Sequence, residues 1–315
     1  MPSFARLKRE SVLRGRFTPA GRALLHAGAI ASQPLDYYTR RRVAARYNEQ
    51  FPSDRMAEAD GYAIMPAGSL PGTTEVVETC RRLFAVKKAA IEAAAPTDKK
   101  TLQREQKKKK SFLRDLLDND DLRANPILVD FALADPLFST ITNYLGVVPS
   151  LTRVDLVYSV PRLNPDEHIA SQLFHQDPEG LRQAKVFLNI FDVEEPNGPF
   201  IFIPASASER LVVAIREERR RSGGKPDDTR YRDQELDAHG GLAETIRLAG
   251  PTGSAVVLDT SRCLHAGSRV RPGHFRLCLF IQYCTTREKA QTFDGRRFRT
   301  DPVKWLALKR YAVGE

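Results

Sequence analysis

The chain has 315 residues, of which 42% are hydrophobic, so it can bury a sizeable core as one large domain or two small ones. Its four cysteines lack CxxC spacing, and no stretch approaches the roughly 18 apolar residues of a membrane span, which argues against a disulfide scaffold and an integral membrane protein. We therefore expect a cytoplasmic protein. The net charge of +10 indicates a surface that attracts anions, such as nucleic acid, phosphorylated metabolites or acidic lipids at the inner face of a membrane.

The first part of the chain, residues 1–145, is predicted to be mainly helical. In TEVVETCRRLFAVKKAAIEAAAP (74–96) the apolar residues recur on one helical face. Thr74 is a candidate N-cap, and Pro96 is expected to stop the helix.

Two further segments complete this helical part. The charged stretch 97–121 predicts a loop that leads into a short helix with an apolar stripe made of Phe112, Leu113, Leu116 and Leu117. The segment DPLFSTITNYLG (135–146) predicts another helix, with Asp135 as cap, Pro136 at its first position and Gly146 beyond its end.

After Gly146 the pattern changes from helical to extended. Five short segments are rich in Val, Ile, Phe and Tyr and are bounded by turn residues: 153–160, 184–193, 200–206, 254–260 and 275–284. Because most of them have no helix between them, they predict an antiparallel double-sheet barrel, or jelly roll.

Two features interrupt the predicted strands. The pair Asn197-Gly198 predicts a hairpin between the second and third strands, because it takes positive φ easily. Residues 206–248 are interpreted as an insertion, with a charged helix (207–221) and a loop (222–234) that could cover a site.

The stretch FHQDPEG places His175 and Asp177 two residues apart, just before an apolar strand. An HxD pair alone is a weak signal, since it fits an ordinary polar loop. His265, in a small-residue turn after the fourth predicted strand, adds a second imidazole, although a core histidine would fit there too. Two imidazoles and a carboxylate form a facial triad, which suits Fe(II) and leaves three coordination positions open.

A cation also opens the last predicted strand. Arg276 stands in FRLCLFIQYC, where a buried charge is costly unless it is paired, so we expect it to bind a ligand carboxylate. Its chief rival is Arg271, which follows Arg269 in a polar turn and is expected to be solvated. Gln172 is a weaker candidate for contact with the site. The other histidines are interpreted as surface or turn residues: His26, His168, His239 and His274.

Together, the HxD pair, FLNIFDVEEPNGPFIFIPAS, LDTSRCLHAGS and Arg276 resemble the phytanoyl-CoA dioxygenase (PhyH) family of Fe(II)/2-oxoglutarate-dependent oxygenases over about residues 150–285. The resemblance implies that His175, Asp177 and His265 ligate Fe(II). It implies further that Arg276 pairs with the distal carboxylate of 2-oxoglutarate, and that O2 is the other cosubstrate.

Further contacts to 2-oxoglutarate are expected from Gly267 or Ser268, and from Asn189 if its strand face lines the barrel. The chain departs from the family at Pro204-Ala205-Ser206-Ala207, where Pro-Gly-Ser-His is frequent. The expected fold class is α+β with a mainly β core, a cupin-like double-stranded β-helix with the helical N-terminal part packed on it. We expect one domain composed of residues 1–145, a core at 146–285 and a tail at 286–315.

The implied reaction is hydroxylation of a C–H bond in a small substrate, with release of succinate and CO2. Asp177 favours hydroxylation, because related halogenases replace this carboxylate with a small residue. The charge, including the basic stretches Lys107–Lys110 and Arg216–Arg221, favours an anionic substrate such as an acyl-CoA, a phosphorylated metabolite or an acidic glycolipid or sugar. The sequence does not indicate the oligomeric state.

Two other functions stay open. One is a catalytically inactive jelly roll that binds anions. The other is a nucleic-acid-directed demethylase of the same superfamily, although the chain has no aromatic-rich recognition segment before the HxD pair, so nucleic acid is not the expected partner.

Overall fold

The computed structural model describes residues 19–93, 112–162, 164, 166–178, 182–226, 228–285 and 291–308. The predicted helix stop at Pro96 and the basic stretch Lys107–Lys110 lie outside these ranges.

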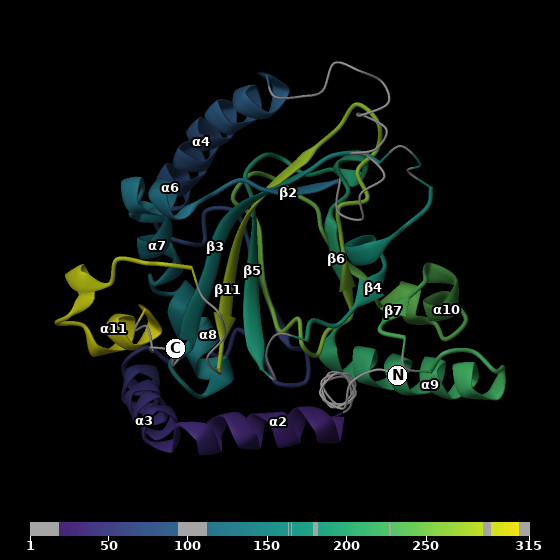
Figure 1. Cartoon of the computed structure of the whole chain (residues 1–315), viewed down its shortest axis with the longest axis horizontal. Coiled ribbons are helices and arrows are strands. Elements are labelled where there is room, and N and C mark those ends of the chain that lie inside the picture. The colour runs from purple at the N-terminus through teal and green to yellow at the C-terminus, as the bar shows by residue number, and fades with distance from the viewer. Residues whose placement is uncertain are drawn as a thin grey trace, which may run out of the picture.

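Two antiparallel sheets face each other across the centre of the molecule (Figure 1). The major sheet has the strand order β1 (Tyr62–Met65), β9 (Ala255–Leu258), β5 (Gln183–Asn189), β11 (Arg276–Cys284), β3 (Ser150–Ser159) and β2 (Leu113–Asp115). The minor sheet has the order β7 (Arg230–Tyr231), β4 (Phe174–His175), β10 (His265–Ala266), β6 (Phe200–Phe202) and β8 (Ile246–Leu248). Two facing antiparallel sheets with strands far apart in sequence as neighbours form a jelly roll, as predicted.

Helices cover the outer faces of both sheets. Their bounds are α2 (Pro19–Ser32), α3 (Pro34–Gln50), α4 (Thr73–Ala93), α6 (Asn119–Ala124), α7 (Ile127–Ala132), α8 (Leu137–Leu145), α9 (Ala205–Arg221), α10 (Asp233–Asp237) and α11 (Pro302–Leu308). Short 3-10 turns lie at Ala170–Gln172, Glu195–Asn197, Gly241–Glu244 and Arg296–Phe298. Helices α3, α7, α8 and α11 gather on the outer side of the major sheet, and α9 lies beside the minor sheet (Figure 1). None of the described helices combines the length and apolarity that crossing a bilayer requires.

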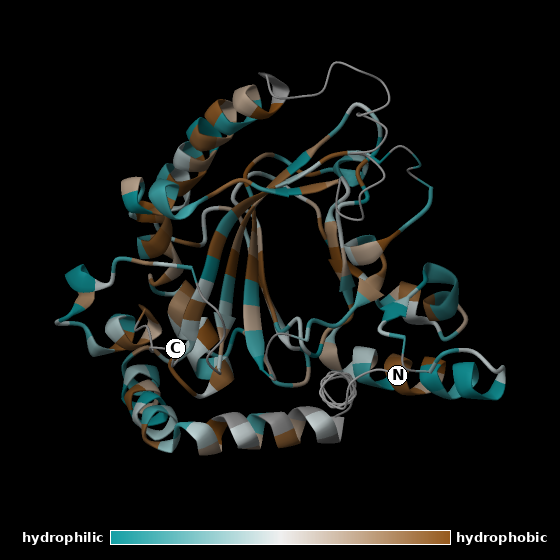
Figure 2. Cartoon of the chain, viewed as in Figure 1, coloured by the Kyte–Doolittle hydropathy of each residue, from teal (hydrophilic) through white to brown (hydrophobic). Residues whose placement is uncertain are grey.

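The central strands of the major sheet have two different faces, and polar residues are interspersed among apolar ones along them (Figure 2). On β11, Leu277, Leu279 and Ile281 belong to the buried cluster shared with the helices. The intervening residues Arg276 and Cys278 point the other way, toward the minor sheet, where they line a cavity. This period of two therefore separates a packed core from the wall of a site.

The predicted elements are largely confirmed. All five predicted strands are present, as β3, β5, β6, β9 and β11, and the helices predicted at 135–146 and 207–221 are α8 and α9. Gly146 ends α8 with φ +66°, as expected of a glycine C-cap. The helix predicted at 74–96 is α4, which begins at Thr73, so Thr74 lies within the helix and is not its N-cap. The four cysteines, all in the described part of the chain, are buried thiols.

The short helix predicted around Phe112–Leu117 is wrong. Residues Leu113–Asp115 form β2 at the edge of the major sheet, paired with β3. The backbone N–H groups of Leu116 and Leu117 donate to Asp155 Oδ1, at 3.2 and 3.0 Å. These partners, which are far away in the sequence, form the backbone hydrogen bonds that a helix would otherwise supply. Tertiary pairing therefore overrides the helical spacing of the apolar residues.

The hairpin predicted at Asn197-Gly198 is also wrong, because the flanking strands β5 and β6 belong to different sheets. The turn instead carries the chain from one sheet to the other. The positive φ expected there is present, at +65° for Gly198. A Cβ atom at this position would lie 2.5 Å from the backbone carbon of Arg269, so only glycine fits.

Two smaller expectations need correction. Pro136 itself occupies the N-cap of α8, and the Asp135 carboxylate accepts a hydrogen bond from the Tyr47 hydroxyl, so it does not cap the helix. Residues 206–248 are more than an insertion, because they supply β7 and β8, which extend the minor sheet at its two edges. Without β7 and β8, strands β4 and β6 would be the edges of this sheet with unpaired backbone groups, which explains the pairing.

Strands β1 and β2 show that the N-terminal part also contributes to the major sheet. The division into residues 1–145, 146–285 and a tail stays a prediction.

Candidate metal centre

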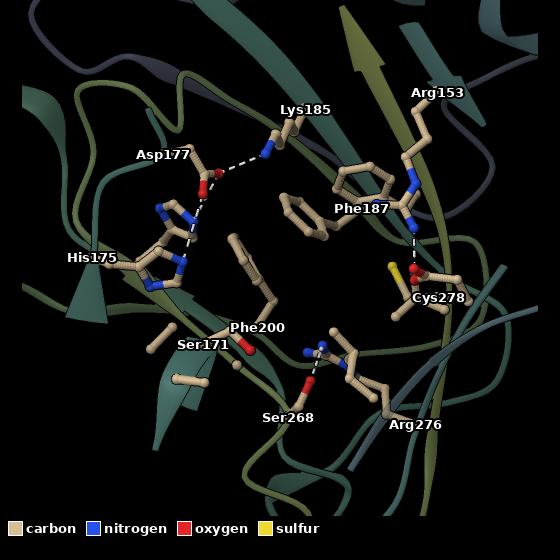
Figure 3. A pocket seen from close by; sticks show the side chains of 18 of the residues that line it. Arg153, Ser171, His175, Asp177, Lys185, Phe187, Phe200, Ser268, Arg276 and Cys278 are labelled. Atoms are coloured by element: carbon tan, nitrogen blue, oxygen red, sulfur yellow. Dashed lines mark hydrogen bonds and ion pairs between the residues drawn. The ribbon is translucent and has the colours of Figure 1, made fainter. Parts of the chain in front are cut away.

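The two predicted imidazoles and the predicted carboxylate converge at one end of the minor sheet. His175 ends β4 and His265 begins β10, and the two residues are direct partners across this strand pair. Asp177 follows two residues after His175. One ligand atom from each side chain lies within 4.8 Å of the other two. The Asp177 carboxylate oxygens lie 3.6 Å from His175 Nε2 and 3.3 Å from His265 Nε2 (Figure 3).

Both imidazoles are oriented by the backbone two residues before them. Nδ1 of His175 lies 2.9 Å from the Leu173 carbonyl oxygen, and Nδ1 of His265 lies 3.0 Å from that of Cys263. A carbonyl oxygen can only accept, so each Nδ1 carries the proton and donates it. Each Nε2 then presents a lone pair toward the other two side chains of the cluster, and this is the tautomer that metal binding needs.

A single turn, residues 259–263, positions both Asp177 and His265. The Asp177 N–H donates to the Thr260 carbonyl at 2.8 Å. Within the turn, the buried carboxylate of Asp259 accepts from the Ser261 N–H at 3.0 Å and from the Tyr144 hydroxyl at 2.8 Å. The Tyr144 hydroxyl, on helix α8, thus stabilises the turn from the core side.

Burial and neighbouring charge hold His175 and Asp177 in the protonation states that bind a metal. Burial, reinforced by His265, lowers the pKa of His175 to about 3, so its imidazole is neutral. Burial opposes ionisation of Asp177, but the Lys185 ammonium beside it outweighs burial and holds the pKa of this carboxyl well below its usual range. A neutral imidazole and an ionised carboxylate are the forms that bind a cation.

The lowered pKa of His175 predicts that the metal-free protein loses stability in acid. The unfolded chain has a histidine of pKa about 6.5, whereas the folded imidazole stays neutral down to about pH 3. Between these values the unfolded state binds the extra proton. The free energy of unfolding should therefore fall as pH falls below 6.5, by up to about 1.4 kcal/mol per pH unit.

Urea unfolding between about pH 6.5 and 5, above the range in which most carboxylates titrate, measures this slope. His175→Gln should reduce it, whereas His274→Gln, at an exposed turn, should leave it as it is. An unchanged slope in His175→Gln would show that this imidazole does not carry the effect.

The triad opens into a cavity of about 350 Å³ between the two sheets. Phe187 and Phe200 stack across it with ring centres 3.8 Å apart, and Figure 3 shows them between the triad and Arg276. The lining residues are Leu113, Asp115, Arg153, Val157, Ala170, Ser171, His175, Asp177, Pro178, Lys185, Phe187, Phe200, Arg230, His265, Ala266, Gly267, Ser268, Arg276, Cys278 and Phe280. The volume suits a small molecule.

Arg276 lies at the opposite end of this cavity from Asp177 (Figure 3). Its side chain is 6% exposed, and one terminal nitrogen donates to the Ser268 hydroxyl at 3.3 Å. Its Nε has no hydrogen-bond partner, and no carboxylate in the described part of the chain forms an ion pair with it. A buried guanidinium without an anion is costly, so the geometry suits an anionic ligand.

The other sequence-predicted residues fall in different places. Ser268 lines the cavity, and its hydroxyl lies 2.9 Å from that of Ser159. Asn189 is buried on the same face of β5 as Lys185, but it lies beyond the lining residues, with its amide 3.5 Å from the Leu248 carbonyl. Its contact with 2-oxoglutarate stays a prediction. Gln172 is buried and donates to the Ser268 carbonyl at 2.9 Å, behind the cavity wall.

The rival arginine and the remaining histidines lie outside the cavity lining. Arg271 is exposed and borders a separate depression. The remaining histidines are partly or fully exposed, as expected: His26, His168, His239 and His274.

Sequence reasoning missed three cations that line the cavity: Arg153, Lys185 and Arg230. Lys185 carried a usable signal, since it stands in an apolar strand just as Arg276 does. Arg230 carried none, because its place depends on β7 pairing with β4, where it lies opposite His175.

No model of a known protein family matches the chain, and no curated protein matches its sequence. Among solved structures, it is similar to EctD from S. alaskensis with bound Fe, with 15% identity, 79% of each chain covered and a TM-score of 0.47. It is also similar to HygX from Streptomyces hygroscopicus with nickel and 2-oxoglutarate bound, with 14% identity, 75% of this chain and 85% of HygX covered, and a TM-score of 0.44.

A third similar structure is SnoK, a non-heme alpha-ketoglutarate-dependent carbocyclase from nogalamycin biosynthesis, with 15% identity, 73% of this chain and 81% of SnoK covered, and a TM-score of 0.43. These identities and TM-scores are too low to assign chemistry by similarity, so we infer the chemistry of the cavity from its own residues.

Proposed function

We propose that the protein is an Fe(II)/2-oxoglutarate-dependent dioxygenase that hydroxylates a C–H bond of a small anionic substrate. The observation that carries this proposal is the cavity itself, with a two-histidine, one-carboxylate cluster at one end and a buried guanidinium without a carboxylate partner at the other. The donor set suits Fe(II), because three protein ligands on one face leave three positions for small molecules.

The far end of the cavity fits the distal carboxylate of 2-oxoglutarate. Arg276 and the Ser268 hydroxyl would bind it, since a guanidinium matches a carboxylate in geometry and charge. Gly267 leaves room there, because a Cβ atom on it would lie 3.3 Å from the guanidinium of Arg276. A side chain at this position would crowd the carboxylate.

The bound iron and 2-oxoglutarate would supply the activation of O2 that hydroxylation of an unactivated C–H bond requires, with succinate and CO2 as the other products. The chain's own residues orient the reactants. Nε2 of His175 and His265 and the carboxylate of Asp177 fix the metal, and the backbone carbonyls behind the imidazoles keep each ring in place. Phe187 and Phe200 give the centre of the cavity an apolar wall, which disfavours water there.

The charges around the cavity support an anionic substrate. Four cationic side chains and two acidic ones line it, and the buried Asp155 also pairs with the lining residue Arg153 at 2.9 Å, so one positive charge is in excess. Fe(II) and 2-oxoglutarate carry opposite charges of equal size and would not change this balance. In the basic stretch Arg216–Arg221, Arg219 and Arg220 pair with Glu235 and Glu217. Arg230 lies next to His175 at the cavity wall, and because of this position we assign substrate capture chiefly to it.

An anionic substrate predicts a salt-sensitive capture step. Exposed charges are screened over about 8 Å at physiological salt, so kcat/KM should fall as salt rises while kcat changes little. Succinate release in a screen of acyl-CoA, phosphorylated and acidic sugar compounds would first identify a substrate.

Arg230→Gln should then lower kcat/KM by about tenfold and flatten its salt dependence. Arg221→Gln, at the exposed end of α9 and outside the cavity lining, is the matched control. A neutral substrate whose kcat/KM changes neither with salt nor with Arg230→Gln would refute the anionic assignment.

The same assays separate the two alternative functions. An inactive anion-binding jelly roll predicts no binding of Fe(II) with 2-oxoglutarate. A nucleic-acid-directed demethylase predicts inhibition of small-molecule turnover by single-stranded or duplex DNA or RNA. The convergence of the triad argues against the first alternative.

A further inference from the structure

We propose that Lys185 is an internal counter-cation for Asp177, which neutralises this carboxylate in the metal-free protein and thereby weakens the binding of a divalent metal. The proposal rests on the metal-ligand roles given to His175, Asp177 and His265, and adds a residue that tunes their affinity. Lys185 would act through Asp177 and would not itself ligate the metal.

Lys185 has a fixed place beside the carboxylate. It lies in β5 between Leu258 of β9 and Gln282 of β11, at the centre of the major sheet. Its side chain is 6% exposed and leaves the strand on the cavity side. Its Nζ lies 2.7 Å from Asp177 Oδ2 and 5.5 Å from the centre of the Phe280 ring (Figure 3). A central strand and an aromatic face thus hold the ammonium in contact with a metal-ligand atom.

The ammonium has opposite effects on the two states of the site. A buried carboxylate without a counter-charge is costly, and Lys185 supplies that charge when no metal is bound. A divalent ion at the triad would share the carboxylate with Lys185, so two cations would lie close together in a site shielded from water. Their repulsion is stronger there than in solution. Lys185 therefore stabilises the metal-free form and opposes the metal-bound one.

Removal of Lys185 also takes away a donor that orients the carboxylate, which by itself would weaken metal binding. This loss is small, because the Asp177 backbone stays tied to the Thr260 carbonyl at 2.8 Å and its two oxygens stay between the imidazoles. Only the side-chain torsions gain freedom. The interaction between adjacent buried charges is larger, so the affinity for metal should rise.

The experiment compares Lys185→Met, which removes the charge at similar length, with Lys185→Arg, which keeps it. Calorimetry with Co(II) alone measures metal affinity, and thermal unfolding with and without Co(II) measures the stability of each state. Lys185→Met should bind Co(II) at least about tenfold more tightly than the wild type. Its metal-free midpoint should fall, its metal-bound midpoint should change less, and Lys185→Arg should resemble the wild type.

A role of Lys185 in packing alone would lower the stability of both states equally and leave the affinity for Co(II) unchanged. An unchanged or weaker affinity in Lys185→Met, with Co(II) still bound by the wild type, would therefore overturn the proposal. If Lys185→Met does not fold, Lys185→Gln tests the same charge with a polar side chain in its place. A wild-type protein that binds no Co(II) would instead overturn the metal site itself.

Discussion

Replacement of His175 by alanine is expected to abolish the weak visible absorption that anaerobic Fe(II) and 2-oxoglutarate should produce together in the wild-type protein. His175→Ala removes one of three ligand atoms that lie within 4.8 Å of one another, and leaves a buried site with one imidazole and one carboxylate. Loss of a residue that only orients a ligand typically costs 10- to 100-fold in metal affinity, so loss of the ligand itself should cost at least about 100-fold. Titration with Fe(II) under argon, followed by absorption, measures the change.

Asp177→Ala should also weaken the absorption strongly, although two imidazoles remain. The matched control is His274→Ala, because His274 is exposed and lies outside the cavity lining. Absorption that persists unchanged in both His175→Ala and Asp177→Ala would exclude these residues from the metal shell. Circular dichroism of each metal-free variant shows whether the fold survives, so that loss of binding is not confused with unfolding.

The convergence of His175, Asp177 and His265 was predictable from the sequence because each of them stands at or just beyond the end of a strand. The HxD pair begins at the end of β4, and His265 opens β10 after a buried strand and a turn. In a double-sheet barrel such positions meet at the barrel mouth. The place of Arg276 on the cavity wall was predictable for a different reason, since a buried charge in an apolar strand is costly unless a ligand or another group neutralises it.

Other parts of the site depend on contacts between residues far apart in sequence. Tyr144 braces the turn that carries His265 through a hydrogen bond to Asp259, and no local pattern links a helix residue to that turn. Arg230 reaches the cavity only because β7 pairs with β4, and β7 has just two residues. A segment this short has no period that a sequence reading could detect.

The errors in the fold have the same origin. The apolar stripe after Phe112 has helical spacing, but the edge of β3 and the carboxylate of Asp155 satisfy its backbone outside a helix. The turn at Gly198 has the residue type and the positive φ of a hairpin, yet it joins two different sheets. The residue types in a turn specify that the chain reverses direction. Which sheet the next strand joins depends on the strands available to pair with it.

Replacement of Arg276 by leucine should raise the concentration of 2-oxoglutarate needed for half-saturation by about 100-fold or more. The guanidinium is buried, its Nε has no hydrogen-bond partner, and no carboxylate in the described ranges neutralises it. A ligand carboxylate would supply both missing interactions, and charge-assisted hydrogen bonds of this kind contribute about 1.5–3 kcal/mol each. Two such bonds account for a change of this size.

Arg271→Leu is the matched control for this prediction, because Arg271 is five residues away, exposed and outside the cavity lining. Titration of 2-oxoglutarate against the anaerobic Fe(II) protein measures binding directly and does not require the substrate to be known. Fe(II) affinity should be nearly unchanged in Arg276→Leu, because the guanidinium lies across the cavity from the triad. A large effect of Arg271→Leu with little effect of Arg276→Leu would reverse the assignment. The buried guanidinium would then have a structural role, and its replacement by leucine, which removes an unpaired buried charge, should stabilise the protein without impairing 2-oxoglutarate binding.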